Sequence, residues 1–551
     1  MSARRRRRGP RSLAALGALA VLAAGCGGGD DAAEAPAQDQ VLVALALDVD
    51  AAGLATAADG VALPSGSSAG RWLTLDDVAA GHGASRATID AAVSALAERG
   101  VDVTADPTGG VLWGTVDVST AESVFDVTLD AVEPAGGGAA VIEPDRTPSV
   151  PDGVEGVTAV VGLRGTAAPG EGVTGTTVPS GGPDTSSPAP PASCPDDAAT
   201  RGTVATAYGL GPLVDGGATG QGATVALLET EALDPTAFDL VAACESTGLA
   251  GDRVASSVVP LAPPATDGPE AALDATVVGL VAPEAAMTVV RFDVAGSIVF
   301  PLLQVLADAE AAGATPTVVV SALGFCEGQL AAGEVAMAEW LLSALAATGT
   351  TTVAATGDVG SSACYPSSDD PAVQYPASSA WVTAVGGVQG GAGGSGDLAV
   401  WNATPGAQEG AGGGVSTAVA RPSWQTGTGQ DGDRRVVPDL SAPAAPGAVQ
   451  QLPRCDDGAC AWAELGGTSL AASGVAGGVA LGAGQGPGGR LGALGPAIDA
   501  AGVAGGGPVT DVTAGDNQVF TDECCTAGPG FDLASGWGVV DLPTLFSSLG
   551  R

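Results

Sequence analysis

Histidine and lysine, the side chains that most often accept protons in enzymes, are almost absent from this chain of 551 residues. The only histidine is His82 and there is no lysine, so every other basic side chain is arginine. Arginine stays protonated in proteins and cannot act as a base. A Ser-His-Asp triad, a Cys-His pair and a Ser-Lys dyad are therefore excluded unless His82 reaches across domains. Zinc sites with histidine ligands are excluded too, whereas oxygen-only sites for calcium or magnesium remain open.

Positive charge is scarce as well. The chain carries 61 acidic side chains against 20 basic ones, which gives a formal net charge of -41. Binding to nucleic acid or to an anionic membrane surface needs a basic face, so we expect no nucleic-acid partner. We interpret most of the acidity as a contribution to solubility.

Apolar runs long enough to span a membrane are missing too. The stretch Ser12 to Gly25 follows a cluster of arginines and is shorter than the roughly 20 residues of a membrane span. Its end, Leu22-Ala23-Ala24-Gly25-Cys26, is similar to a bacterial lipobox, in which the cysteine is lipidated. We expect a signal peptide over 1–26 and a polar tether over 27–40. A lipid anchor at Cys26 would hold the protein on the outer face of the bacterial cell membrane; plain secretion is the alternative.

Cysteine usage agrees with export. Apart from Cys26 there are eight cysteines, all after residue 190, and an even number in an oxidising compartment favours disulfides. Cys455 and Cys460 bracket a short turn, so we expect them to pair. The other partners cannot be deduced from spacing; they are Cys194, Cys244, Cys326, Cys364, Cys524 and Cys525.

The first folded region is expected over 41–165. Its pattern has the order β-α-β-β-α-β, which is typical of a ferredoxin-like α+β sheet. The predicted strands are Val41 to Val49, Val101 to Thr104 and Val111 to Val116, followed by further strand, and the helices are Ser85 to Arg99 and Ser119 to Phe125. Ser85 is placed to cap the first helix and Gly100 to end it. Residues 166–193 are rich in Pro, Gly and Ser and are predicted to be a linker.

The second region, 194–551, alternates short apolar strands with helices. This alternation predicts an α/β fold, a parallel sheet with helices on both faces and functional residues at the carboxyl ends of strands. The predicted strands include Ala223 to Glu229, Met287 to Phe292, Val318 to Ser321 and Thr351 to Ala355. The predicted helices include Ser297 to Ala311 and Ala332 to Ala347.

Ser469 is a candidate nucleophile. It follows Gly466-Gly467-Thr468 and precedes an Ala/Gly/Val-rich stretch, Leu470 to Leu481, that reads as a buried helix. A serine at a helix N-terminus lies where free backbone N–H groups favour negative charge. The alternative for this serine is a plain helix cap.

Glu270 and Asp274 are candidates for the base that histidine would otherwise supply. Their i, i+4 spacing places both carboxyls on one face of a helix whose flanking residues are apolar. Two buried carboxyls side by side cannot both ionise, so a shared proton persists in mild acid. The alternative is a solvated acidic stripe.

Asp358 follows the strand Thr351 to Ala355, so it is expected at the strand's carboxyl end. In its protonated form it could donate a hydrogen bond to an oxyanion. From the local sequence alone, a turn aspartate is the favoured alternative.

Together these segments resemble the sedolisin family of serine-carboxyl peptidases, and the resemblance covers residues 41–551. Seven motifs occur in the family's order. They are Glu270-x-x-Leu273-Asp274 with Ala282-Pro283, Gly357-Asp358, Tyr375 to Ser379 before Trp381 to Gly387, Gly412 to Ser416, Pro422 to Gln425, Pro438 to Ser441 and Gly467-Thr468-Ser469.

The resemblance implies a subtilisin-like sheet preceded by a kumamolisin-type activation prodomain, made as a zymogen. Ser469 would attack the scissile carbonyl, Glu270 would take its proton, and Asp274 would orient Glu270. A protonated Asp358 would stabilise the oxyanion. The substrates would be proteins or peptides, cleaved by an endopeptidase or tripeptidyl peptidase, with the prodomain as intramolecular inhibitor. Glu229 matches an outer carboxylate that some members link to the catalytic glutamate.

The resemblance also implies a calcium site near the C-terminus. Its ligands would be side-chain and carbonyl oxygens, which suit Ca²⁺. The residues are Asp511, Val512, Gly528, Gly530 and Asp532. A plain glycine-rich turn is the alternative.

The chain departs from the family at three positions. Ser473 replaces a usual proline, Leu323 a usual aromatic and Val359 a common serine. The aromatic at position 323 would support an extended proton network through Glu229, so its loss argues against that network. A second reading is an inactive, anchored peptide-binding protein with the same fold, but all four presumed catalytic side chains are present.

Overall fold

The computed structural model describes residues 40–63, 68–132, 140–166, 194–233, 235–244, 253–263, 267–293, 295–390, 397–402, 408–456, 459–485 and 487–549. The predicted signal peptide with Cys26, nearly all of the tether and the linker after residue 166 lie outside these ranges. Within them, no helix is both long and apolar enough to cross a bilayer.

The N-terminal region, 40–166, is built on a four-stranded sheet with the order β2-β3-β1-β6. Every neighbouring pair in it is antiparallel. The strands are β1 (Gln40–Leu47), β2 (Thr104–Ala105), β3 (Val111–Asp117) and β6 (Val157–Gly162). The helices α3 (Arg86–Ala97) and α4 (Val118–Phe125) lie in the two crossovers. The predicted ferredoxin-like order is therefore confirmed.

The same region contains elements that the pattern did not predict. Two more helices, α1 (Ala51–Ala62) and α2 (Leu75–His82), precede α3, and a small second sheet contains β4 (Leu129–Val132), β5 (Val141–Pro144) and β7 (Gly165–Thr166). The helix α1 contains two glycines, so its intrinsic helix propensity is low. Packing of α1 against a helix of the second region stabilises it instead. The Ser85 cap is confirmed: its hydroxyl accepts a hydrogen bond from Thr88 N at 3.1 Å.

A large sheet forms the centre of the second region, with the order β10-β12-β8-β13-β15-β17-β21-β25-β24. All pairs from β10 to β25 are parallel, and β24 is an antiparallel edge strand. The strands are β8 (Thr224–Glu229), β10 (Val254–Val258), β12 (Ala286–Arg291), β13 (Val318–Ser321), β15 (Thr351–Ala355), β17 (Val382–Gln389), β21 (Leu440–Pro443), β24 (Val509–Thr510) and β25 (Val539–Val540). The four predicted strands are confirmed to within one residue.

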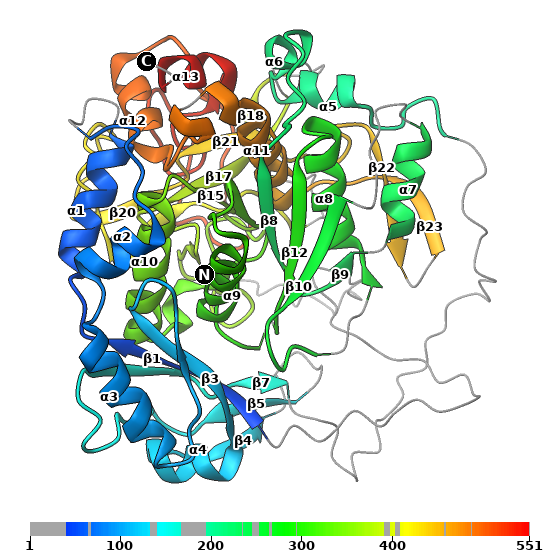
Figure 1. The fold of residues 1–551 in the computed structure, drawn as a ribbon. Helices are drawn as coiled ribbons and strands as arrows, with labels where there is room; N and C mark the ends of the chain where they lie inside the picture. The colour runs from blue at the N-terminus through cyan, green and yellow to red at the C-terminus, as the bar shows by residue number, and fades with distance from the viewer. Residues whose placement is uncertain are drawn as a thin grey trace, which may run out of the picture.

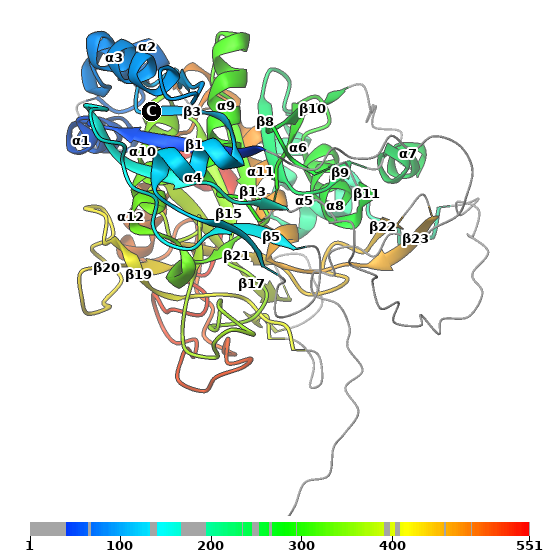
Figure 2. The same cartoon turned by 90° about the horizontal axis from the view of Figure 1, so that it is seen from below.

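Both faces of this sheet are covered, and alternate residues of each strand contribute to two hydrophobic cores. In β8, Val225 and Leu227 pack toward one side with α8 (Pro269–Val281) and α11 (Thr468–Gly482). Ala226 and Leu228 pack toward the other side with α9 (Val299–Ala312) and α10 (Ala332–Ala347). This three-layer arrangement, visible in Figures 1 and 2, confirms the predicted α/β class.

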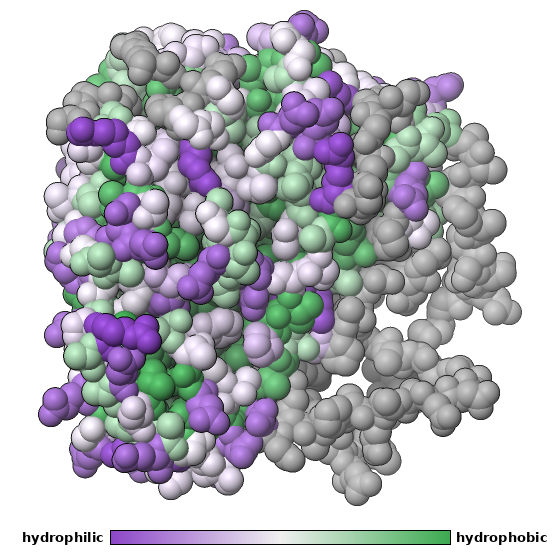
Figure 3. All heavy atoms as spheres, viewed as in Figure 1, coloured by the Kyte–Doolittle hydropathy of each residue, from purple (hydrophilic) through white to green (hydrophobic). Residues whose placement is uncertain are grey.

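The N-terminal region covers α9 and α10, so it forms an outer layer of the molecule (Figure 1). Leu42 of β1 and Leu54 of α1 share a core with these two helices. Trp340 Nε1 donates a hydrogen bond across the contact to Thr108 Oγ1 at 2.8 Å. Hydrophilic side chains are scattered among apolar ones on the outer face in the same view (Figure 3).

Shorter elements decorate the large sheet. They are α5 (Arg201–Ala207), α6 (Gly211–Asp215), β9 (Ala232–Leu233), α7 (Pro235–Cys244), β11 (Asp267–Gly268), β14 (Phe325–Cys326), β16 (Gln374–Tyr375), β18 (Ala399–Val400), β19 (Gly414–Ala420), β20 (Arg434–Val437), β22 (Gln451–Asp456), β23 (Ala459–Glu464), α12 (Gly495–Ala504) and α13 (Leu542–Leu549). The predicted pair Cys455–Cys460 joins β22 to β23. The remaining disulfides are Cys194–Cys244, Cys326–Cys364 and Cys524–Cys525.

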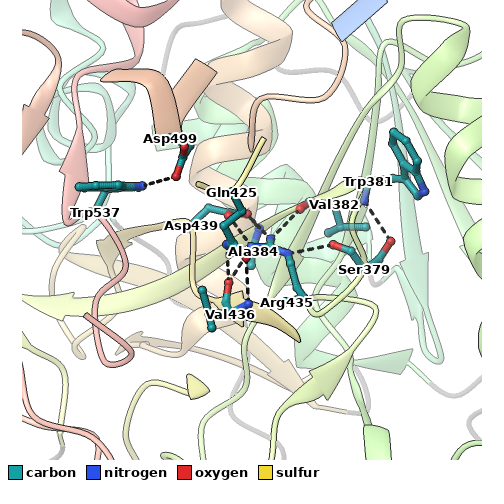
Figure 4. Close-up of polar contacts among 10 residues, drawn as sticks. All are labelled: Ser379, Trp381, Val382, Ala384, Gln425, Arg435, Val436, Asp439, Asp499 and Trp537. Carbon is teal, nitrogen blue, oxygen red and sulfur yellow. Dashed lines mark hydrogen bonds and ion pairs between the residues drawn. The ribbon is translucent and has the colours of Figure 1, made fainter. Parts of the chain in front are cut away.

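Several of the family-like motifs meet in a structural cluster around the buried guanidinium of Arg435 (Figure 4). Arg435 Nη2 pairs with Asp439 Oδ2 at 2.6 Å, and Nη1 donates to Asp439 Oδ1 at 2.8 Å. Arg435 also donates to carbonyls of the segment 379–382 and lies over the ring of Trp424. These motif residues therefore hold loops to the sheet.

Replacing Arg435 with leucine is expected to destabilise the protein by about 3–5 kcal/mol, because Asp439 would be left as a buried charge without a partner. The neighbouring Arg434 is exposed, so Arg434→Leu is a matched control expected to change stability by about 0.5 kcal/mol or less. Denaturant unfolding followed by tryptophan fluorescence measures both. Equal unfolding midpoints for the two variants would contradict this account of the cluster.

Candidate active site

The helices α8 and α11 lie side by side on one face of the sheet and carry the predicted nucleophile and base. Val277 and Val281 of α8 share a core with Val475 and Val479 of α11. Glu270 is the second residue of α8 and Ser469 the second residue of α11. Their packing therefore brings two side chains that are 199 positions apart in the chain to the same edge of the sheet.

Asp358 lies in the loop after β15, next to the N-terminus of α11. The backbone at Gly467 has φ 127°, a conformation that favours glycine. A β-carbon there would come within 2.8 Å of Asp358 Oδ2 and 3.0 Å of Ser469 Oγ. Gly467 thus leaves open the space between these two oxygens, where a substrate carbonyl could enter.

Thr468 fixes the orientation of the Asp358 carboxyl. Asp358 Oδ1 accepts hydrogen bonds from Thr468 N at 2.8 Å and from Thr468 Oγ1 at 2.7 Å. Burial raises the pKa of Asp358, and these two bonds only partly oppose the shift. Because Oδ1 is occupied as an acceptor, a proton on this carboxyl belongs on Oδ2, which faces the Gly467 and Ser469 side.

The loop that carries Asp358 is supported by the glycine-rich motif. Gly412 N donates to Gly357 O at 2.8 Å, and Gly410 N donates to Asp358 O at 2.9 Å. A β-carbon at Gly412 would meet Thr356 O at 2.0 Å, so only glycine allows this approach. The motif therefore positions the Asp358 loop.

Glu270 is partly buried and is expected to hold a proton near neutral pH. Burial raises the pKa of Glu270 from 4.5 to about 8, and the negative charge of Asp274 adds to the shift. The Ser469 hydroxyl, as a hydrogen-bond donor, lowers the pKa of Glu270. The side chains of Ser469 and Glu270, which the sequence predicted as nucleophile and base, therefore face each other.

Asp274 and Glu229 are buried behind Glu270. Burial raises the pKa of Asp274 from 3.8 to about 7, and burial likewise raises the pKa of Glu229. Among the described residues, neither these four carboxyl oxygens nor the nearby Ser473 hydroxyl has a hydrogen bond of normal geometry. A proton shared between the two carboxyls would satisfy both.

The arrangement therefore brings a serine hydroxyl, two carboxyls with raised pKa values and the Asp358 carboxyl to one site that contains neither histidine nor lysine. Glu229, at the end of β8, lies beyond Asp274 and Glu270, and these three side chains form a carboxyl row. The aromatic that the sequence resemblance would place near Glu229 is replaced by Leu323. Leu323 packs on the core at the opposite face and its carbonyl accepts a bond from Ser321 Oγ at 2.8 Å. Val359 pairs through its backbone with Gly410.

Two further carboxylates near the site were not predicted. Glu231 Oε2 accepts a hydrogen bond from Glu270 N at 3.1 Å. The negative charge of Glu409 raises the pKa of Asp358. In the sequence, Glu231 lies just after Glu229 and Glu409 lies just before Gly412. That proximity was the only available signal, because the approach of both side chains to the site depends on loop conformation.

The five residues predicted to bind calcium come together in one loop region. Gly530 N donates to Asp511 Oδ2 at 2.8 Å, and Gly528 N donates to Asp532 Oδ2 at 2.9 Å. Ser535 Oγ contacts both Val512 O and Asp532 Oδ1. Two carboxylates and a carbonyl are hard oxygen donors of the kind that Ca²⁺ prefers, and in this structure the carboxylate oxygens accept hydrogen bonds from backbone N–H groups.

Stability is expected to fall as the pH rises from 4 to 8. The native state holds protons on carboxyls whose pKa values are raised, whereas the unfolded chain releases them near pH 4. The native state therefore binds more protons in this range, which lowers the free energy of unfolding with increasing pH.

Melting temperatures of the Ser469→Ala protein across pH 4 to 8 measure this slope. Adding Glu229→Gln is expected to make the slope shallower, because one of the shifted carboxyls is lost. Glu155→Gln, at an exposed position, is the control and should leave the slope unchanged. A steeper or unchanged slope in the Glu229→Gln protein would contradict the shared proton.

Comparison with known proteins finds sequence similarity to an activation domain and to sedolisin. A family model described as "Pro-kumamolisin, activation domain" matches residues 28–165. Sedolisin from Pseudomonas sp. (strain 101) is 31% identical over 276 residues, which cover 46% of this chain and 46% of that protein. The match thus spans about half the length of the curated relative.

The solved structure of a sedolisin supports the fold. Pseudomonas sedolisin, a serine-carboxyl proteinase complexed with two molecules of pseudo-iodotyrostatin, has a TM-score of 0.53 and 25% identity over 64% of this chain and 97% of that one. A lanthipeptide protease has a TM-score of 0.40 and 15% identity over 62% of this chain and 92% of that one. The chain is a sedolisin-like protein with a pro-kumamolisin-type activation domain at its N-terminus.

Proposed function

We propose that this protein is the zymogen of a serine-carboxyl peptidase that hydrolyses peptide bonds in proteins or peptides. One observation carries the proposal: Ser469 Oγ lies between Glu270 and Asp358 Oδ2, and the absence of a side chain at Gly467 leaves space beside the two oxygens. A nucleophile, a base and an oxyanion donor are thereby available in a chain that has a single histidine, His82, and no lysine. The enzyme cleaves either as an endopeptidase or as a tripeptidyl peptidase.

Each side chain has one task in this reaction. Ser469 attacks the scissile carbonyl while its proton passes to Glu270, which later gives the proton to the leaving amine. Asp274 orients Glu270 and holds a proton with Glu229. Asp358 donates a hydrogen bond from its protonated Oδ2 to the oxyanion of the tetrahedral intermediate.

The activation domain acts as intramolecular inhibitor, and loss of the segment before residue 194 activates the enzyme. Export, the lipid anchor at Cys26 and a location on the extracellular side of the bacterial membrane belong to the same proposal. They rest on the sequence of 1–26 and on an even number of cysteines that pair in the folded region.

Activity is expected to be lost in the Ser469→Ala protein at every pH, and Asp358→Ala, which removes the oxyanion donor, is expected to lower kcat by about 100-fold or more. Parent activity should decline as the pH rises through 7. Glu270 must be ionised to accept the Ser469 proton, but Asp274, with a pKa raised to about 7, and Asp358, whose pKa is also raised, must keep their protons.

The measurement follows loss of the activation domain and cleavage of a denatured protein substrate between pH 3 and 9, with product masses separating endopeptidase from tripeptidyl cleavage. A rate maximum at pH 9 would contradict the carboxyl mechanism. A folded, calcium-loaded protein that cleaves nothing but binds peptides would favour the alternative of an inactive peptide-binding surface protein.

Calcium is proposed to bind at Asp511, Val512, Gly528, Gly530 and Asp532, where it would tie the C-terminal loops together. A chelator is expected to lower the melting temperature of the parent by several degrees, because binding stabilises only the folded state. In Asp511→Asn and Asp532→Asn proteins the chelator should have a much smaller effect. Asp541→Asn, near the C-terminal helix, is the control. An equal chelator effect in all four proteins would exclude this site.

A further inference from the structure

Glu231 has no role in the mechanism above, yet it touches the proposed base directly. It lies two residues after Glu229, in the turn between β8 and β9. Its Oε2 accepts a hydrogen bond from the backbone N–H of Glu270 at 3.1 Å. The side chain thus connects the strand end that carries the outer carboxyl to the helix start that carries the base.

The backbone on either side reinforces this connection. Residues Ala232 and Leu233 of β9, directly after Glu231, pair in parallel with Asp267 and Gly268 of β11. The strand β11 leads straight into α8, whose second residue is Glu270. The pairing of β9 with β11 and the side-chain hydrogen bond of Glu231 therefore hold the segment after Glu229 against the segment that leads to Glu270.

A carboxylate suits this position at the start of α8. The first N–H groups of a helix have no partner within the helix, and Pro269 at the first position lacks an N–H altogether. The N–H of Glu270 is therefore the first one that needs an acceptor. A negatively charged acceptor is additionally favoured by the helix dipole.

We propose that Glu231 is a positioning residue, which holds the first turn of α8 against the end of β8 and so sets where Glu270 meets Ser469. The proposal rests on the peptidase function above and deepens it. Because Glu231 is partly exposed and outside the buried carboxyl row, it acts on the reaction only through Glu270 and its neighbours.

The charge of Glu231 has a second, electrostatic consequence. It adds to the raised pKa values of Glu229, Glu270 and Asp274. Other elements also face these groups. They are Asp358 after β15 and Ser469 of α11 toward Glu270, and Ser473 of α11 and Tyr208 after α5 toward Asp274. Glu231 is the only partner among these that is both charged and hydrogen-bonded to the backbone of the base.

Three substitutions separate the hydrogen bond from the charge. Glu231→Gln keeps an oxygen that can accept from Glu270 N but removes the charge. Glu231→Asp keeps the charge, but its side chain is one methylene too short for the bond. Glu231→Ala removes both, and Glu310→Gln, on the exposed end of α9, is the control for loss of a distant charge.

Kinetics against pH are measured first, on enzyme freed of its activation domain. Glu231→Gln is expected to keep kcat within about twofold at its optimum and to move the falling limb toward acid by about 0.5 to 1 pH unit. Glu231→Asp is expected to lower kcat about 10-fold or more with little acid shift of the limb. Glu231→Ala should show both effects, with KM little changed in all three.

Hydrogen exchange is measured second, in the Ser469→Ala background, so that it does not depend on activity. Exchange at the Glu270 amide is expected to accelerate in the Ala and Asp variants and to stay at the parent rate in Gln and in the control. Parent-like exchange in the Ala variant would overturn the proposal even if the protein proves inactive. If the enzyme is active, a parent-like kcat in the Asp and Ala variants would also overturn the proposal. A parent-like falling limb in the Gln variant would do the same. Parent activity no higher than that of the Ser469→Ala protein would refute the peptidase function alone.

Discussion

The active site depends on several carboxyl groups that are packed together without a cation to balance them. Among the described residues, the ion pairs involve none of Glu229, Glu270, Asp274 and Asp358. Burial and mutual repulsion disfavour their charged forms, so protons take the place of counter-ions. In the proposed reaction, Glu270 accepts the Ser469 proton in its ionised form while its neighbours stay protonated, and a protonated Asp358 donates a hydrogen bond to the oxyanion.

The same protein handles a buried carboxylate in the opposite way in the Arg435 cluster. There Asp439 is paired with the guanidinium of Arg435 at 2.6 Å, and backbone carbonyls accept hydrogen bonds from other N–H groups of Arg435 (Figure 4). A charge that is fully paired is inert, which suits a cluster that ties loops to the sheet. Family-like motifs occur at both places, and only the partners of each carboxylate distinguish a structural role from a chemical one.

The architecture explains why the carboxyl row can be rigid. Glu229 ends a central strand, Glu270 and Ser469 begin two helices packed against each other, and the Asp358 loop is held by Thr468 and by the glycine-rich segment. The opposite face of the sheet, covered by α9, α10 and the activation domain, contributes none of the four carboxyls and does not carry Ser469. The activation domain can therefore be removed from one layer while the helices that carry the chemistry keep their own core.

The sequence by itself determined the class of chemistry and much of the fold. The absence of lysine and the single histidine favoured carboxyls as bases, and strand and helix periodicities located β8, β13, β15 and α10 because these elements are mostly buried. The sequence did not show that α1 is helical, which cysteines pair with Cys194 and Cys326, or that Glu231 reaches Glu270. Those features depend on contacts between segments far apart in the chain, whose energies exceed local preferences and leave no local pattern. Only the tertiary structure decided them, as it decided that Glu229 lies against Asp274, because burial and distance between carboxyls exist only once the sheet and its helices have packed.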